Sequence, residues 1–140
     1  MLRAGWIILL VWGGVHCLCS ALSLAYAILE KHAPLLKAFL SQKELENTDA
    51  RIHSIAKFAD IWLTSCAACS GAFALVIVWF GVREGQHWAF WALLFVGLFY
   101  QTMSLVADSY VSNRIIIFNI SSFVVFIIGI AVSGYGLFGG

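Results

Sequence analysis

The stretch Ile115–Phe138 reads IIIFNISSFVVFIIGIAVSGYGLF and contains no charged side chain. An α-helix rises about 1.5 Å per residue, so a stretch of this length is able to cross a hydrocarbon layer of roughly 30 Å. The strict alternation of apolar and polar residues that marks a transmembrane β-strand is absent. The stretch therefore predicts a transmembrane helix.

Three further apolar stretches predict transmembrane helices on the same grounds, and they are Gly5–Leu29, Phe58–Val82 and His87–Tyr110. Across the 140 residues, 62% are hydrophobic and 11% are charged, whereas a soluble domain has roughly 45–50% apolar and about 25% charged residues. Four spans and their connections use up the chain, so we expect residues 1–140 to form a single membrane domain. The predicted fold is an all-α membrane protein, a four-transmembrane-helix up-and-down bundle.

The long polar connection between the first two spans covers residues 30–57. Apolar side chains recur in it at helical spacing, and they are Leu35, Leu36, Phe39 and Leu40. Pro34 suits the first position of a helix, so we expect a short amphipathic helix on the membrane surface. Thr48 or Asp49 is expected to cap a second helix that continues into the second span.

The charged residues favour one orientation of the bundle. The end that holds both termini carries Arg3 and Arg83, together with Trp6 and Trp79, which are typical of a membrane interface. The opposite end carries six basic residues, which are Lys31, Lys37, Lys43, Arg51, Lys57 and Arg114. Because basic residues collect in cytoplasmic loops, the connection 30–57 is predicted to be cytoplasmic, with both termini on the opposite side. A net charge of +1 and the lack of a basic tract give no reason to expect a nucleic-acid partner.

Each predicted span carries one row of polar or small side chains at a spacing of three to four residues. Polar groups are costly against lipid, so these rows are expected to face one another inside the bundle. Trp12, Phe90, Leu94 and Phe126 fill the end near the termini, which predicts a polar-lined pocket that opens on the side of the connection. The candidate ligand-binding residues are His16, Asp60, Thr64, Gln101, Ser104, Asp108 and Asn119, and Ser122 belongs to the same row as Asn119.

Two interpretations of these rows remain open. In the first, the polar side chains form hydrogen bonds between helices and fix their packing, with Asp60 paired to Lys57 and Asp108 paired to Arg114. In the second, they line a pocket for a lipid, a sterol-like or a quinone-like molecule. His16 is predicted to lie near the middle of the bilayer, where an ionisable side chain is a functional candidate.

Small residues form a separate pattern that predicts close helix contacts, and these positions are Gly13, Cys17, Ala21, Ala25, Gly129 and Ser133. Cys66 and Cys69 form a CxxC pair, but at about 100° per residue they lie roughly 120–180° away from the row of Asp60 and Thr64. Thiolates need a polar or electropositive setting, so we expect the cysteines to pack as small apolar residues and predict no metal site. The alternative is a thiol-redox or copper site built from His16, Cys19, Cys66 and Cys69.

The sequence contains no P-loop and no GxGxxG, HExxH or GxSxG motif. Enzymatic activity stays undecided, and a non-enzymatic role is favoured. We expect an accessory or structural subunit of a larger membrane complex or homo-oligomer, whose partners are membrane lipids and other subunits or itself. No cofactor is predicted, and in the alternative function a bound lipid or quinone occupies the pocket.

Overall fold

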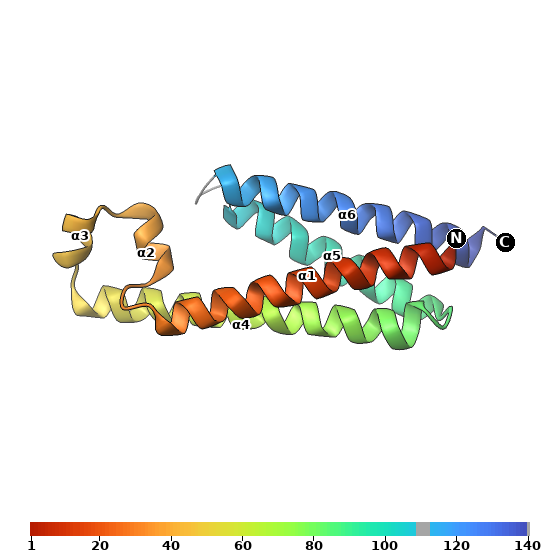
Figure 1. The fold of residues 1–140 in the computed structure, drawn as a ribbon, viewed down its shortest axis with the longest axis horizontal. Coiled ribbons are helices and arrows are strands. Elements are labelled where there is room, and N and C mark those ends of the chain that lie inside the picture. Colours follow the sequence, from red (N-terminus) through yellow and green to blue (C-terminus); the bar gives the residue numbers. More distant parts are fainter. Residues whose placement is uncertain (109–112, 140) are drawn as a thin grey trace. The chain divides into compact units, whose positions relative to one another are not determined.

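The computed structural model describes residues 1–108 and 113–139, and the side chains of residues 1–106 and 117–139. The protein is 88% helical, and the described residues contain no strand. Its four long helices are α1 (Leu2–Leu29), α4 (Ala50–Ile77), α5 (His87–Asp108) and α6 (Asn113–Phe138) (Figure 1). All four are long and apolar enough to cross a membrane. The predicted all-α, four-helix membrane bundle is therefore confirmed.

The helix of the second span begins before the apolar stretch itself. We expected a helix capped at Thr48 or Asp49 to continue into this span, and α4 begins at Ala50 and continues through the π-helical turn η1 (Val78–Val82). Asp49 Oδ1 accepts a hydrogen bond of 2.6 Å from the backbone N–H of Arg51, so the predicted cap at this helix start is confirmed. The apolar span is thus extended at its start by two polar turns of the same helix.

The connection between the first two spans contains two short helices, α2 (Pro34–Phe39) and α3 (Gln42–Glu46), where we expected one. Ser41 separates them, because its hydroxyl accepts from the N–H of Glu44 while the carboxylate of Glu44 accepts from the N–H of Ser41. This reciprocal capping box satisfies donors that would otherwise lack partners at a helix start. A new helix therefore begins at residue 42. The predicted position of Pro34 in the first turn of α2 is confirmed.

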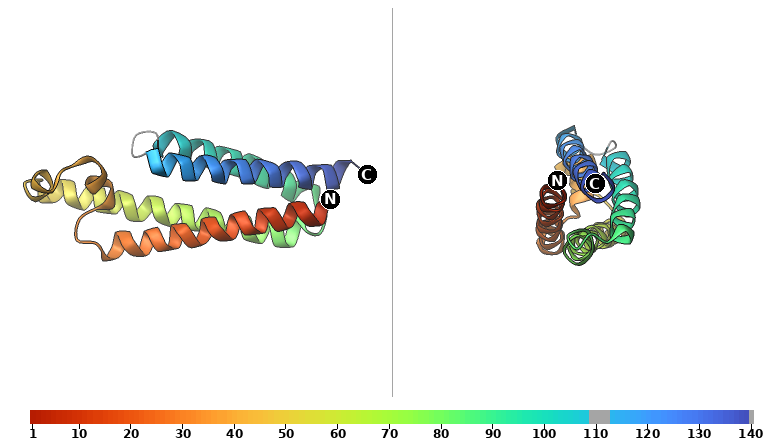
Figure 2. Two further views of the ribbon diagram at one scale, coloured as in Figure 1. Left: turned by 45° about the horizontal axis from the view of Figure 1, so that its top comes forward. Right: turned by 90° about the vertical axis from the view of Figure 1, so that its right-hand side faces the viewer.

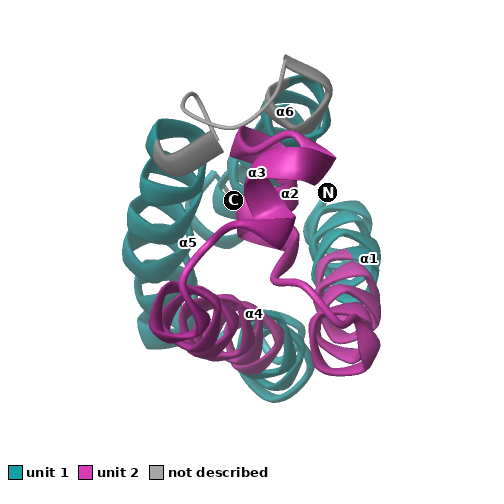
Figure 3. Ribbon diagram, turned by 90° about the vertical axis from the view of Figure 1, so that its left-hand side faces the viewer, with its two compact units in different colours: residues 1–15, 71–140 teal, residues 16–70 magenta. Residues whose placement is uncertain are grey.

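The chain divides into two compact units, shown in Figure 3. Unit 1 consists of residues 1–15 and 71–140, and unit 2 consists of residues 16–70. The helices α1 and α4 each contribute to both units. The single membrane domain stays a prediction.

The apolar core of unit 1 is formed by side chains from all four long helices. Trp12, Phe90 and Phe126 are buried in it, and Leu94 packs against it. The rings of Trp12 and Phe126 lie 4.8 Å apart between centroids. Figure 2 shows α5 and α6 side by side along this unit. These contacts confirm the apolar end of the bundle that the sequence predicted.

The helices α1 and α6 approach each other closely in unit 1. A Cβ atom placed on Gly5 would lie 2.5 Å from the backbone nitrogen of Ser133 and 2.7 Å from its Cα. One turn away on each helix, a Cβ on Gly129 would lie 2.7 Å from Leu9 Cδ2. Small residues allow such close approach of two backbones in a membrane. Gly129 and Ser133, both predicted as packing residues, therefore lie at a contact within the chain.

The turn from η1 to α5 is tight. The N–H of Arg83 donates to the carbonyl of Val78 at 2.9 Å, and the N–H of Gln86 donates to that of Gly81 at 3.0 Å, so both bonds have π-helical spacing. Gly85 has a φ of +74°, a conformation that costs glycine little. Arg83, at this turn, lies over the ring of Trp79, at 4.4 Å from Cζ to the ring centroid.

Candidate functional site

The residues predicted to line one pocket are divided between the two units. His16, Asp60 and Thr64 belong to unit 2, whereas Gln101, Ser104 and Asn119 belong to unit 1. The side chain of Asp108, and with it the expected pair to Arg114, lies outside the described residues. A common pocket lined by all seven residues stays a prediction. The structure gives the contacts of the described residues within their own unit.

A buried hydrogen-bond network lies in unit 1 around Ser122. The Nε1 atom of Trp12 donates to Ser122 Oγ at 3.0 Å, and Nε2 of Gln101 donates to the same oxygen at 3.1 Å. Gln101 is fully buried, and its Oε1 atom has no hydrogen-bond partner among the described residues. Asn119 is also buried, one turn from Ser122 on α6. The predicted site residues did not include Ser122. Its place in the same polar row as Asn119 could have identified it.

Asp60 and Lys57 hold the connection of unit 2 in place. The backbone N–H of Leu35 donates to Asp60 Oδ2 at 3.0 Å, and Lys57 Nζ donates to the carbonyl oxygen of Glu30 at 2.9 Å. Ala33, at the N-cap of α2, offers no side-chain acceptor, so the carboxylate on α4 takes over that task. The expected ion pair of Asp60 with Lys57 is wrong, because the two side chains bind backbone groups at two helix ends instead.

Thr64, Lys37 and Glu30 of unit 2 have partners close in the sequence. Thr64 Oγ1 donates to the carbonyl of Asp60 at 2.7 Å within α4. Lys37 forms an ion pair and a hydrogen bond with Glu30. The hydrogen bond from Lys37 lowers the pKa of Glu30, and the same bond raises the pKa of Lys37. His16 is buried on α1. The pair of Lys37 with Glu30 links α2 to the end of α1.

All four cysteines are free thiols and belong to unit 2. Cys17 Sγ lies 3.8 Å from the carbonyl oxygen of Ala68, whereas Cys66 and Cys69 are exposed. Among the residues that the structure describes, no three His, Cys, Asp or Glu side chains are grouped as a metal site requires. The alternative site of His16, Cys19, Cys66 and Cys69 stays a prediction without a structural cluster behind it.

The small residues predicted to form a row on α1 differ in their contacts. A Cβ on Gly13 would lie 3.2 Å from Leu75 Cδ2 on α4, and Cys17 contacts α4 through its thiol. Ala21 and Ala25 are exposed. The first half of the row therefore packs inside the chain, and the second half is open to another molecule.

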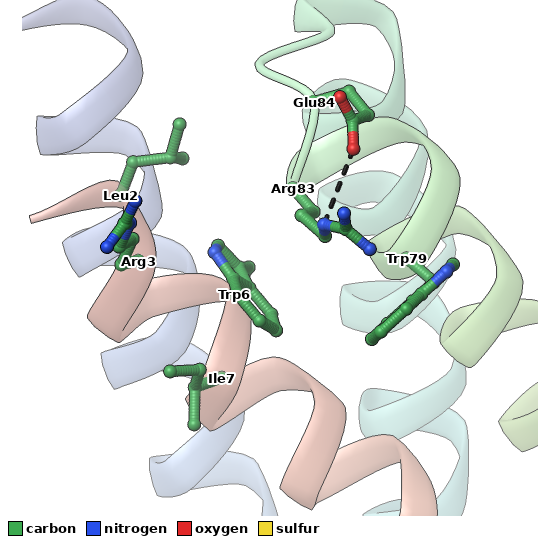
Figure 4. Close-up of a pocket in the computed structure, with 7 residues that line it drawn as sticks. All are labelled: Leu2, Arg3, Trp6, Ile7, Trp79, Arg83 and Glu84. Carbon is green, nitrogen blue, oxygen red and sulfur yellow. Dashed lines mark ion pairs between the residues drawn. The ribbon is translucent and has the colours of Figure 1, made fainter.

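A groove of about 860 Å³ opens in unit 1 between the first turns of α1 and the end of η1 (Figure 4). The rings of Trp6 and Trp79 face each other edge to face, with centroids 6.3 Å apart and an angle of 88°. Arg83 Nε lies 3.3 Å from Glu84 Oε1. Arg3 has no carboxylate within ion-pair distance among the described residues. The residues that line the groove are Leu2, Arg3, Trp6, Ile7, Trp79, Arg83 and Glu84.

No protein-family model, curated protein or solved structure matches the chain. The four apolar helices identify an integral, multi-pass membrane protein. The cytoplasmic location of the connection stays a prediction that rests on the distribution of basic residues.

Proposed function

We propose that this protein is a non-enzymatic membrane subunit that packs laterally, through α1 and α4 of unit 2, against another membrane protein or a second copy of itself. The outer surface of unit 2 gives the main support. On α1, Ala21 and Ala25 are exposed four residues apart, and Leu18 and Leu22 on the same side are about three-fifths exposed. Small residues at this spacing let a second helix approach closely in a membrane.

The exposed face of α4 has the same character. Cys66 and Cys69 are exposed at successive turns, and Trp62 and Leu63 before them are more than half exposed. A free cysteine behaves in packing as a small apolar residue. Lipid tails accept bulky apolar side chains equally well, so it is the small positions between them that favour a protein partner.

The exposed thiols allow a direct test in native membranes. Two thiols form a disulfide only when their Cα atoms approach to about 4.4–6.8 Å. Oxidation with copper phenanthroline should therefore join Cys66 or Cys69 of one chain to a second copy, or to a partner cysteine at the same face. A Cys66→Ser, Cys69→Ser double variant should lose the product. If the wild-type chain gives no cross-linked product and no larger complex in native extracts, the proposal is wrong.

Bulky substitutions test the face of α1. Ala21→Phe and Ala25→Phe fill the small positions and should reduce the fraction of chain found in the larger assembly on native gels. Val11→Phe is the matched control, because it enlarges an exposed apolar residue of the same helix in unit 1, outside the proposed contact. Equal assembly of all three variants would show that this face of α1 meets only lipid.

Binding of a small amphipathic molecule is the second candidate function. Its support is Gln101, whose fully buried Oε1 atom lacks a hydrogen-bond partner among the described residues. A buried acceptor without a donor costs about 1–3 kcal/mol, so a ligand hydroxyl near it would be favoured. Mass spectrometry of organic extracts of the purified protein should then find one stoichiometric lipid or quinone-like molecule, and Gln101→Leu should lose it. Retention of that molecule by Gln101→Leu would exclude this site.

A further inference from the structure

Two arginines that are distant in the sequence line the same groove of unit 1. Arg3 stands on the first turn of α1, and Arg83 stands at the end of η1 on the other wall (Figure 4). They are the basic residues that the sequence assigns to the end of the bundle with the termini. A guanidinium group offers planar, forked N–H donors that match the oxygens of a phosphate group.

The aromatic residues place this groove at a membrane interface. Trp6 and Trp79 line it together, and tryptophan is enriched where the hydrocarbon layer meets the headgroups. Arg83 lies over the ring of Trp79, and this contact holds its guanidinium against the same wall of the groove. Ile7, one turn further along α1 than Arg3 and about half exposed, continues the lining as an apolar surface. The groove thus offers cations at one end and apolar contact beside them.

The charges of the groove favour an anion. Its charged side chains are two arginines and Glu84, which gives a net charge of +1. Glu84 forms an exposed ion pair with Arg83. Such a pair adds little stability, so a bound anion is able to replace the carboxylate. Arg3 has no such competitor among the described residues. A single phosphodiester anion would balance the groove, whereas a zwitterionic headgroup would bring a cation as well.

We propose that this groove binds the headgroup of an anionic phospholipid, with Arg3 and Arg83 on the phosphate, Trp6 and Trp79 around the glycerol region, and Ile7 against the acyl chain. This site is independent of the lateral contact proposed for unit 2. The apolar continuation beside the cations is the reason to choose a lipid over a free phosphate ion.

The test uses the full chain in vesicles that mix phosphatidylcholine with phosphatidylglycerol. Lipids brominated on the acyl chain quench the fluorescence of nearby tryptophan. Trp62, Trp88 and Trp91 are exposed outside the groove and are replaced by phenylalanine in every chain tested. The quenching by brominated phosphatidylglycerol relative to brominated phosphatidylcholine then gives the relative affinity of the groove. A basic residue near an anionic membrane surface is worth about fivefold in affinity. We expect the wild-type chain to prefer phosphatidylglycerol, and Arg3→Gln and Arg83→Gln to lower this preference about fivefold each.

Three variants control the result. Arg3→Lys with Arg83→Lys keeps the charge but removes the forked N–H donors, so it should retain part of the preference, which also shows that the groove tolerates substitution. Glu84→Gln removes the competing carboxylate and should raise the preference. Arg51→Gln removes an exposed cation from unit 2, where Ala50, Arg51, Ser54 and Ile55 line another surface hollow, and should leave the preference unchanged.

Two outcomes would overturn the proposal. In one, the wild-type chain and the Arg3→Gln, Arg83→Gln double variant show the same preference, which would assign the quenching to general lipid contact. In the other, soluble glycerol 3-phosphate at millimolar concentration displaces brominated phosphatidylglycerol, which would make the site a receptor for free phosphate esters. A preference that depends on both arginines and resists the soluble ester supports the phospholipid site.

Discussion

The close contact between α1 and α6 makes Gly5→Ala a sharp test of the packing in unit 1. The methyl group of alanine would lie 2.5 Å from the backbone nitrogen of Ser133 and 2.7 Å from its Cα. These are main-chain atoms, so no side-chain rotation relieves the overlap and the two helices have to separate. Gly14, also on α1 in unit 1, has no atom within 4 Å of the position of an added Cβ.

The comparison of the two variants isolates the steric effect. Both replace a glycine of α1 by alanine, so each gains helix propensity, by at most about 1 kcal/mol. Overpacking a tight contact costs about 1–3 kcal/mol. We therefore expect Gly5→Ala to be about 1–3 kcal/mol less stable than Gly14→Ala, which is roughly 5- to 150-fold in the folding equilibrium.

Reversible unfolding in mixed micelles of dodecyl maltoside and sodium dodecyl sulfate measures this difference, with far-ultraviolet circular dichroism as the signal. Gly14→Ala should unfold at the same or a higher fraction of sodium dodecyl sulfate than the wild-type chain, and Gly5→Ala at a lower one. If Gly5→Ala proved as stable as Gly14→Ala, the close approach of α1 and α6 at Ser133 would be refuted.

Three further predictions follow from hydrogen bonds of single side chains. Ser122→Ala removes the oxygen that accepts from two buried donors and should lower the unfolding free energy by about 1–3 kcal/mol, whereas Ser121→Ala, on an exposed position, should change it little. Asp60→Ala should speed amide hydrogen exchange at Leu35, and Asp60→Asn, which keeps an acceptor oxygen, should slow it again; equal rates in the two variants would contradict the proposed cap of α2. The Ser41 hydroxyl, and then the Ser41 N–H, lower the pKa of Glu44 from its ordinary value of 4.5, so the capping box stabilises α3 at neutral pH and this stabilisation is lost as the pH falls from 4.5 through the folded-state pKa. Titration by nuclear magnetic resonance should show this low pKa and its return towards 4.5 in Ser41→Ala, and an unchanged pKa in that variant would contradict the assignment.

The sequence was sufficient to predict the four spans. A long apolar stretch is favoured in the hydrocarbon layer, where a helix satisfies its own backbone hydrogen bonds. It also indicated that a helix capped near Asp49 continues into the second span, as α4 does. The Ser41 and Glu44 spacing was a readable capping box that would have divided the connection into α2 and α3.

The site residues were harder to foresee, because their partners are set by packing rather than spacing. Lys57 and Asp60 lie three residues apart, which suggested an ion pair, yet uncapped backbone groups at the ends of α1 and α2 bind them more effectively. Arg3 and Arg83 were placed at the same end of the bundle by counting spans. That they line one groove depends on the contact of α1 with η1, for which the sequence offers no local signal.

The most direct test of the lateral-packing proposal is the mass of the protein extracted from its native membrane without detergent. Extraction into styrene–maleic acid discs, followed by release and native mass spectrometry, reports every protein chain that accompanies it. The proposal predicts a particle that contains a second copy or a different membrane protein at fixed stoichiometry. A single 15.4 kDa chain with no accompanying protein would contradict it.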